Sequence, residues 1–154
     1  MKSKTCCFTG HRNLSESDIL DIQQQLYIII ESLIKKGVIY YGCGGAIGFD
    51  TMAAETVLEL KKIYPQVKLI MVLPCHDQDK YWSTKDKEKY VYINNQADKI
   101  VYTSKEYTSD CMLKRNRHLV DNSSYCICYL RNNTGGTAYT VSYAKSKSLN
   151  IIQI

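Results

Sequence analysis

Residues 38–50 read VIYYGCGGAIGFD, an apolar run followed by a turn rich in glycine. The run at 38–41 predicts a strand, and apolar residues at helical spacing predict a helix over 52–63. A glycine turn between a strand and a helix lets the backbone approach a phosphate, and the helix N-terminus offers free N–H donors. The stretch therefore predicts one strand–turn–helix unit of an α/β fold.

The same alternation of strand and helix continues outward to both ends of the chain. Because the predicted strands are apolar on both faces and each is followed by a helix, they indicate a parallel sheet covered on both sides. We predict a Rossmann-like, doubly wound α/β domain with a mostly parallel sheet, whose strand-to-helix loops lie along one edge. Further strands are predicted at 4–8, 67–73, 99–102, 125–130 and 150–154, and further helices at 15–36, 85–96, 111–121 and 137–147.

The composition is that of a globular protein. The chain has 154 residues, of which 45% are hydrophobic and 23% charged, and this predicts a single domain spanning residues 1–154. The longest apolar run, at 26–30, is far below the ~20 residues of a membrane span, and no charged-then-apolar leader opens the chain. We therefore expect a cytoplasmic protein without membrane contact.

The seven cysteines follow no metal-binding pattern. They form no CxxC pair and fit no zinc-ligand spacing, and most lie in apolar strand-like runs. Buried thiols are therefore expected, with no metal site. The net charge of +5 is dispersed apart from one basic cluster at 114–118, which can indicate an anionic ligand. A single-stranded DNA binder needs a longer basic groove, so nucleic acid is not expected as a partner.

Polar and glycine residues gather where the strands end. Each glycine turn alone is a weak signal, and two in one small sheet are a stronger one. In the helix at 111–121, Asn116 falls in the middle of an apolar stripe with Arg115 at its border, so the amide needs a hydrogen-bond partner. The candidate ligand-binding residues are Thr9, Gly10, His11, Arg12, Gly44, Gly45, Gly48, Asp50, Arg115, Asn116, Gly135, Gly136 and Thr137.

Several short motifs occur in an order that resembles a known family. They are FTGHR at 8–12, GAIGFD at 45–50, RN at 115–116 and GGT at 135–137. Together they resemble the YpsA-like family of the SLOG (Smf/DprA–Lonely Guy) superfamily. That superfamily has a Rossmann-like fold and includes the Lonely Guy phosphoribohydrolases, the DNA-processing protein DprA, and sensor domains for signals derived from NAD or ADP-ribose. The resemblance implies that the turns at 44–48 and 135–137 hold phosphate and ribose.

The chain departs from the Lonely Guy enzymes at one decisive position. Their motif PGGxGTxxE ends in a glutamate that acts on the ribosyl bond, and Thr140 stands in its place here, whereas Arg115 is similar in position to an arginine of their active site. A threonine cannot stabilise the oxocarbenium-like state of N-glycoside cleavage. The resemblance thus favours a sensor or regulatory domain that binds a nucleotide of the ADP-ribose or NAD class and requires no cofactor.

Two alternatives remain open at the level of sequence. One is a nucleotide N-glycosidase that uses Asp50 or Glu55 in place of the missing glutamate. The other is a single-stranded DNA binder similar to DprA. The residues assign no catalytic group, leave the role of Trp82 and the 75–84 loop undefined, and are compatible with a homo-oligomer.

Overall fold

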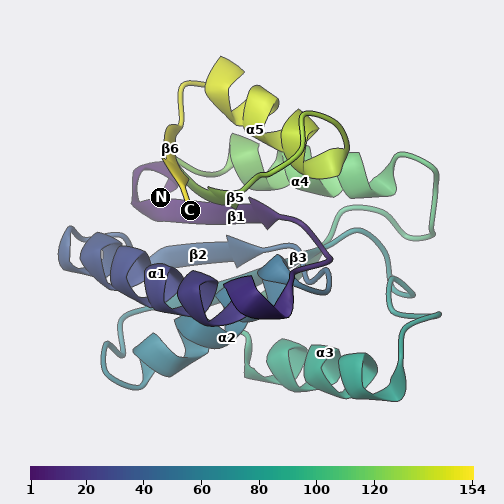
Figure 1. Ribbon diagram of the computed structural model, residues 1–154, viewed down its shortest axis with the longest axis horizontal. Coiled ribbons are helices and arrows are strands. Elements are labelled where there is room, and N and C mark those ends of the chain that lie inside the picture. Colours follow the sequence, from purple (N-terminus) through teal and green to yellow (C-terminus); the bar gives the residue numbers. More distant parts are fainter.

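The computed structural model describes residues 1–154 and contains one sheet of six strands that all pair in parallel (Figure 1). The predicted Rossmann-like α/β class is confirmed, and the sheet is wholly rather than mostly parallel. In chain order the elements are β1 (Thr5–Gly10), α1 (Glu16–Lys35), β2 (Tyr40–Cys43), α2 (Phe49–Lys61), β3 (Lys68–Leu73), α3 (Thr84–Gln96), β4 (Lys99–Tyr102), α4 (Cys111–Asp121), β5 (Tyr125–Tyr129), α5 (Gly136–Ser146) and β6 (Asn150–Gln153).

The strand order places β1 at a topological switch point. The order is β4-β3-β2-β1-β5-β6, so the chain builds outward from β1 in one direction and then returns to its other side. Helices α1, α2 and α3 cover one face of the sheet, and α4 and α5 cover the other (Figure 1). In open sheets of this kind, ligands bind beyond the carboxyl ends of the strands at the switch point, here between β1 and β5.

Two apolar clusters hold the layers together. The larger one fills the space between the sheet and the first helices, with Phe8, Leu26 and Val57 fully buried, and the smaller one lies under α4 and α5. Successive residues of a strand point to opposite faces, and both faces are covered here, which explains the unbroken apolar runs. All seven cysteines are buried free thiols, as their sequence context predicts.

The predicted boundaries hold to within a few residues. Ser15 is the N-cap of α1, as predicted, but its hydroxyl donates to the Asp18 carboxylate at 2.7 Å instead of accepting a backbone N–H, so the capping box is incomplete. Helix α2 begins at Phe49, three residues earlier than its apolar spacing indicates, which brings Asp50 into its first turn. None of the helices combines the length and the apolar character needed to cross a membrane.

Candidate functional site

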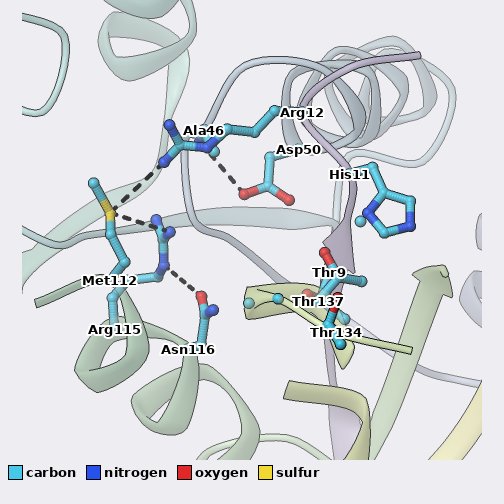
Figure 2. A pocket seen from close by; sticks show the side chains of 13 residues that line it. Thr9, His11, Arg12, Ala46, Asp50, Met112, Arg115, Asn116, Thr134 and Thr137 are labelled. Carbon is cyan, nitrogen blue, oxygen red and sulfur yellow. Dashed lines mark hydrogen bonds between the residues drawn. The ribbon is translucent and has the colours of Figure 1, made fainter. Parts of the chain in front are cut away.

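A pocket of about 230 Å³ opens at the carboxyl ends of β1 and β5, at the switch point. Four segments that are distant in sequence form its wall (Figure 2). They are the end of β1, the turn before α2, the first turns of α4 and the turn that opens α5. The lining residues are Thr9, Gly10, His11, Arg12, Ala46, Asp50, Met112, Arg115, Asn116, Thr134, Gly135, Gly136 and Thr137.

Arg115 projects from α4 into the interior and is 3% exposed. Its Nε donates to the Asn116 side-chain oxygen at 2.6 Å, and its Nη1 donates to the Gly44 carbonyl. Its Nη2 contacts only the sulfur of Met112, at 3.7 Å, and a thioether is a weak acceptor. Burial lowers the pKa of Arg115, and the nearby Asp50 carboxylate opposes that shift. The buried guanidinium therefore keeps donor capacity beside the pocket.

A second guanidinium, that of Arg12, approaches the same sulfur from the loop after β1 (Figure 2). Its Nη2 lies 3.9 Å from the Met112 sulfur, and none of the three ion pairs in the structure involves an arginine. Two positive groups thus converge at the pocket without a carboxylate hydrogen-bonded to either one. An anionic ligand would supply the strong acceptors that Met112 does not.

Asp50, in the first turn of α2, is the carboxylate of this pocket. It is 7% exposed, and one of its oxygens accepts the Ala46 N–H at 3.4 Å. Burial raises the pKa of Asp50 to about 6, although Arg115, the Ala46 N–H and Arg12 each lower it. At neutral pH the carboxylate is largely ionised, and the two arginines leave the pocket with a net positive charge.

Helix α5 directs an uncapped N-terminus at the pocket. Its N-cap is Gly135, with φ +98°, and no side chain caps its first turn. The first N–H groups of a helix have no intrahelical partner, and the helix dipole favours an anion there. A side chain at Gly135 or Gly136 would extend into open space, so both positions leave the helix end accessible.

The glycines of the 44–48 turn lie behind the pocket wall instead of lining it. Gly44, Gly45 and Gly48, which were expected to hold phosphate, are not among the residues that line this pocket. The missing side chain of Gly44 would collide with the Arg115 guanidinium, and that of Gly48 with the Arg12 backbone. At Gly45 the neighbours are Leu73, Tyr90 and Gln78. These glycines permit close packing, and from this turn only Ala46 reaches the pocket, together with Asp50 in the first turn of α2.

The structure brings the other ten candidate residues together around the pocket. On α4 the prediction placed Asn116 in the middle of the buried face and Arg115 at its border, but in the structure Arg115 is buried and Asn116 is only half-buried. The long Arg115 side chain reaches inward to the Gly44 carbonyl, whereas the Asn116 amide stays at the pocket and its oxygen accepts a hydrogen bond from the Arg115 Nε. His11 accepts the Arg131 N–H through Nε2 at 2.7 Å, which fixes its ring at the pocket edge.

Three lining residues were missed by sequence reasoning: Ala46, Met112 and Thr134. The sequence pattern places Met112 in an apolar stripe, and its position one helical turn before Arg115 was the available signal. Thr140, at the position of the Lonely Guy glutamate, donates its hydroxyl to the Gly136 carbonyl at 2.7 Å and does not line the pocket. Glu55 also lies outside it, exposed and 3.8 Å from Lys89.

This geometry is accompanied by similarity to a known family along nearly the whole chain. The model of the YspA SLOG family, YpsA, matches residues 6–153. The chain belongs to the YspA SLOG family. YoqJ of Bacillus subtilis strain 168, an uncharacterized SPbeta prophage-derived protein, is 32% identical over 144 residues, which cover 85% of this chain and 84% of the relative. A UPF0398 protein of Bacillus pumilus is 29% identical over 128 residues, covering 81% of this chain and 69% of the relative.

Solved structures show the same fold as this member of the YspA SLOG family. DNA processing protein A of Helicobacter pylori, described with its single-stranded DNA binding mode, matches with a TM-score of 0.67 at 20% identity. DNA processing protein A of Streptococcus pneumoniae matches with a TM-score of 0.67 at 16% identity. The matches cover 97% and 99% of this chain but only 64% and 50% of those longer chains. At such identities the likeness concerns the fold.

Proposed function

We propose that this chain binds a nucleotide-type ligand of the ADP-ribose or NAD class at the switch-point pocket and acts as a sensor or regulatory domain. The observation that carries the proposal is the pairing of Arg115 with the uncapped start of α5. A buried arginine whose outer nitrogen meets only a thioether lies beside a helix N-terminus that lacks a side-chain cap. A phosphate would accept hydrogen bonds from both.

The size of the pocket supports binding of one part of a nucleotide. Its volume of about 230 Å³ is below the roughly 300–1,000 Å³ that is typical of pockets enclosing a whole small ligand. It therefore suits a ribose phosphate, with the remainder of the ligand extending beyond the pocket. The phosphate would face Arg115, Arg12 and the α5 N–H groups, and the ribose hydroxyls would reach Asp50, which is a strong acceptor when ionised.

Arg12→Ala provides the cleaner test of phosphate binding, because Arg12 is exposed and its guanidinium contacts only Met112. We expect its loss to weaken binding of ribose 5-phosphate roughly tenfold, as for one charge-assisted contact, with the fold retained. Isothermal titration calorimetry gives the affinity, and thermal unfolding checks the fold. Arg117→Ala is the control, because Arg117 is another arginine, in the basic cluster at 114–118, and it bonds to Tyr139 outside the pocket. Equal affinity of all three proteins would contradict the proposed phosphate position.

Binding without bond cleavage is the expected outcome with nucleotides. Thr140 supplies no charge and does not line the pocket, and Glu55 lies outside it, so Asp50 is the one remaining carboxylate. A missing electrostatic stabiliser commonly costs ~10²–10³ in rate. We expect no appreciable release of adenine from AMP, NAD or ADP-ribose by chromatography. Robust release that is abolished by Asp50→Asn would instead identify an N-glycosidase with Asp50 as its carboxylate.

Single-stranded DNA is the second candidate ligand, and the fold shared with DNA processing protein A favours it. The same pocket would then hold one backbone phosphate of a strand. Fluorescence anisotropy with a labelled oligothymidylate at 50 and 200 mM salt separates the two cases. A strand that contacts several phosphates loses affinity steeply with salt, whereas a mononucleotide held in one pocket changes far less. Tight, salt-sensitive oligonucleotide binding would displace the nucleotide proposal.

A further inference from the structure

A second cavity adjoins the switch-point pocket and shares two of its residues. It has a volume of about 360 Å³, and His11 and Arg12 line both cavities. It lies between the loop after β1, the start of α1 and the segment after β5. Its other lining residues are Asn13, Ser15, Asp18, Tyr129, Arg131 and Asn132. A ligand anchored in the first cavity can therefore extend past His11 into the second.

Arg131 forms a flat, fixed surface in this second cavity. Its guanidinium carbon lies over the Tyr129 ring, 4.1 Å from the ring centre, in a cation–π contact. One of its terminal nitrogens donates to the carbonyls of Leu130, at 3.2 Å, and Ile154, at 2.8 Å. These contacts hold an exposed arginine in one orientation at the wall of the cavity. Guanidinium planes held in this way are surfaces on which nucleobases stack.

The remaining polar groups of the cavity favour a nucleobase over a second phosphate. The Asp18 carboxylate accepts from the Ser15 hydroxyl at 2.7 Å and from the Tyr129 hydroxyl at 3.3 Å, both through the same oxygen. Its other oxygen accepts from neither hydroxyl, and a carboxylate both repels phosphate and accepts from an amino group. The exposed amides of Asn13 and Asn132 add the paired donor and acceptor that recognise the edge of adenine.

We propose that this second cavity binds an amino-bearing purine base, stacked on Arg131, when the phosphate and ribose of the same nucleotide occupy the switch-point pocket. The inference rests on the proposed function, because the first cavity must supply the anchor. It assigns the part of the chain that would recognise the base of such a ligand. His11 stands between the two cavities and is tied to the Arg131 backbone at 2.7 Å, so one rigid connection sets the spacing of phosphate and base.

The test compares AMP, IMP and ribose 5-phosphate by calorimetry on the full chain. Stacking of one base commonly contributes enough to tighten binding roughly tenfold, so AMP should bind about that much more tightly than ribose 5-phosphate. IMP lacks the amino group and should fall between the two. If AMP and ribose 5-phosphate bind equally, the base cavity is wrong while the phosphate site stands. If neither binds, the proposed function and this inference both fail.

Variants of Arg131 separate stacking from simple charge attraction. In both Arg131→Ala and Arg131→Lys, the affinity for AMP should fall to that for ribose 5-phosphate. The affinity for ribose 5-phosphate itself should change by less than about twofold. The Lys147→Ala variant is the control, since Lys147 also lies over a tyrosine ring, that of Tyr143 at 5.5 Å, on the distant end of α5. If Arg131→Lys binds AMP as tightly as the natural protein, the cavity only attracts the negative charge of the nucleotide, and the base assignment is wrong. Unchanged AMP affinity in Arg131→Ala would also overturn it.

Discussion

Replacing Gly48 by alanine is expected to destabilise the fold by roughly 2–6 kcal/mol. Gly48 has φ +80° and ψ −122°, a conformation that residues with a side chain rarely adopt, at a cost of order 1–3 kcal/mol. A Cβ there would collide with the Arg12 carbonyl oxygen, and such overpacking costs typically 1–3 kcal/mol more. Because backbone atoms cannot rotate aside, the loop that carries His11 and Arg12 would have to move. Denaturant unfolding measures the loss.

Gly37→Ala is the matched control for this experiment. Gly37 also has a positive φ, +95°, but a Cβ there meets nothing within 4 Å. It should therefore show only the conformational cost, of order 1–3 kcal/mol. A loss at Gly48 no larger than that at Gly37 would contradict the close backbone contact between the 44–48 turn and the loop after β1. Such a result would also mean that Gly48 does not determine the position of Arg12.

The stability of the protein should fall between about pH 4 and pH 6 because of Asp50. Burial raises the pKa of Asp50 from 3.8 to about 6, so the folded state binds the proton more tightly than the unfolded chain does. A raised pKa gives stability that is present below the unfolded value and lost as the pH rises through the folded one. The difference corresponds to on the order of 3 kcal/mol. Asp50→Asn should remove this part of the pH dependence.

Unfolding free energies at pH 4, 5, 6 and 7 test this directly. Each protein's unfolding free energy is compared with its own value at pH 4. As the pH rises, this free energy should fall in the natural protein but not in Asp50→Asn, and the difference between the two should be largest above pH 6. Asp21→Asn is the control, because Asp21 is exposed and its carboxylate bonds only to Gln25, at 2.8 Å. Parallel curves for the natural protein and Asp50→Asn would show that the Asp50 carboxylate is not buried.

The sequence predicted the elements and the edge of the sheet well because both follow from local patterns. Doubly buried strands read as apolar runs, and parallel connections then bring the loops after β1, β2 and β5 to one edge. Thr9 to Arg12 and Gly135 to Thr137 could thus be placed near one another without coordinates. Their shared edge follows from the alternation of strands and helices, whereas the strand order that places β5 beside β1 comes from the structure.

The parts that sequence reasoning missed depend on side-chain packing. From sequence alone, a glycine in the 42–48 run that faces a ligand cannot be distinguished from one that packs against a side chain such as Gln78 or Arg115. A helical projection placed Asn116 inward, but it does not include the length of the arginine, which reaches the Gly44 carbonyl across the sheet edge. The second cavity was invisible for the same reason, since Tyr129 and Arg131 are adjacent to a strand end and carry no recognisable motif.

The position of β1 between β2 and β5 also fixes an order of assembly during synthesis. Until residues 125–129 have emerged, the chain can form only the sheet β4-β3-β2-β1. In that sheet β1 is an unpaired edge, because the strand that pairs with it, with Cys126 opposite Cys7, has not yet been made. Exposed apolar edges of this kind favour association between chains. The switch-point pocket is completed only when β5 docks beside β1 and the start of α5 follows it. A ribosome-bound chain that lacks residues 125–154 is therefore expected to be prone to aggregation and to lack a complete switch-point pocket.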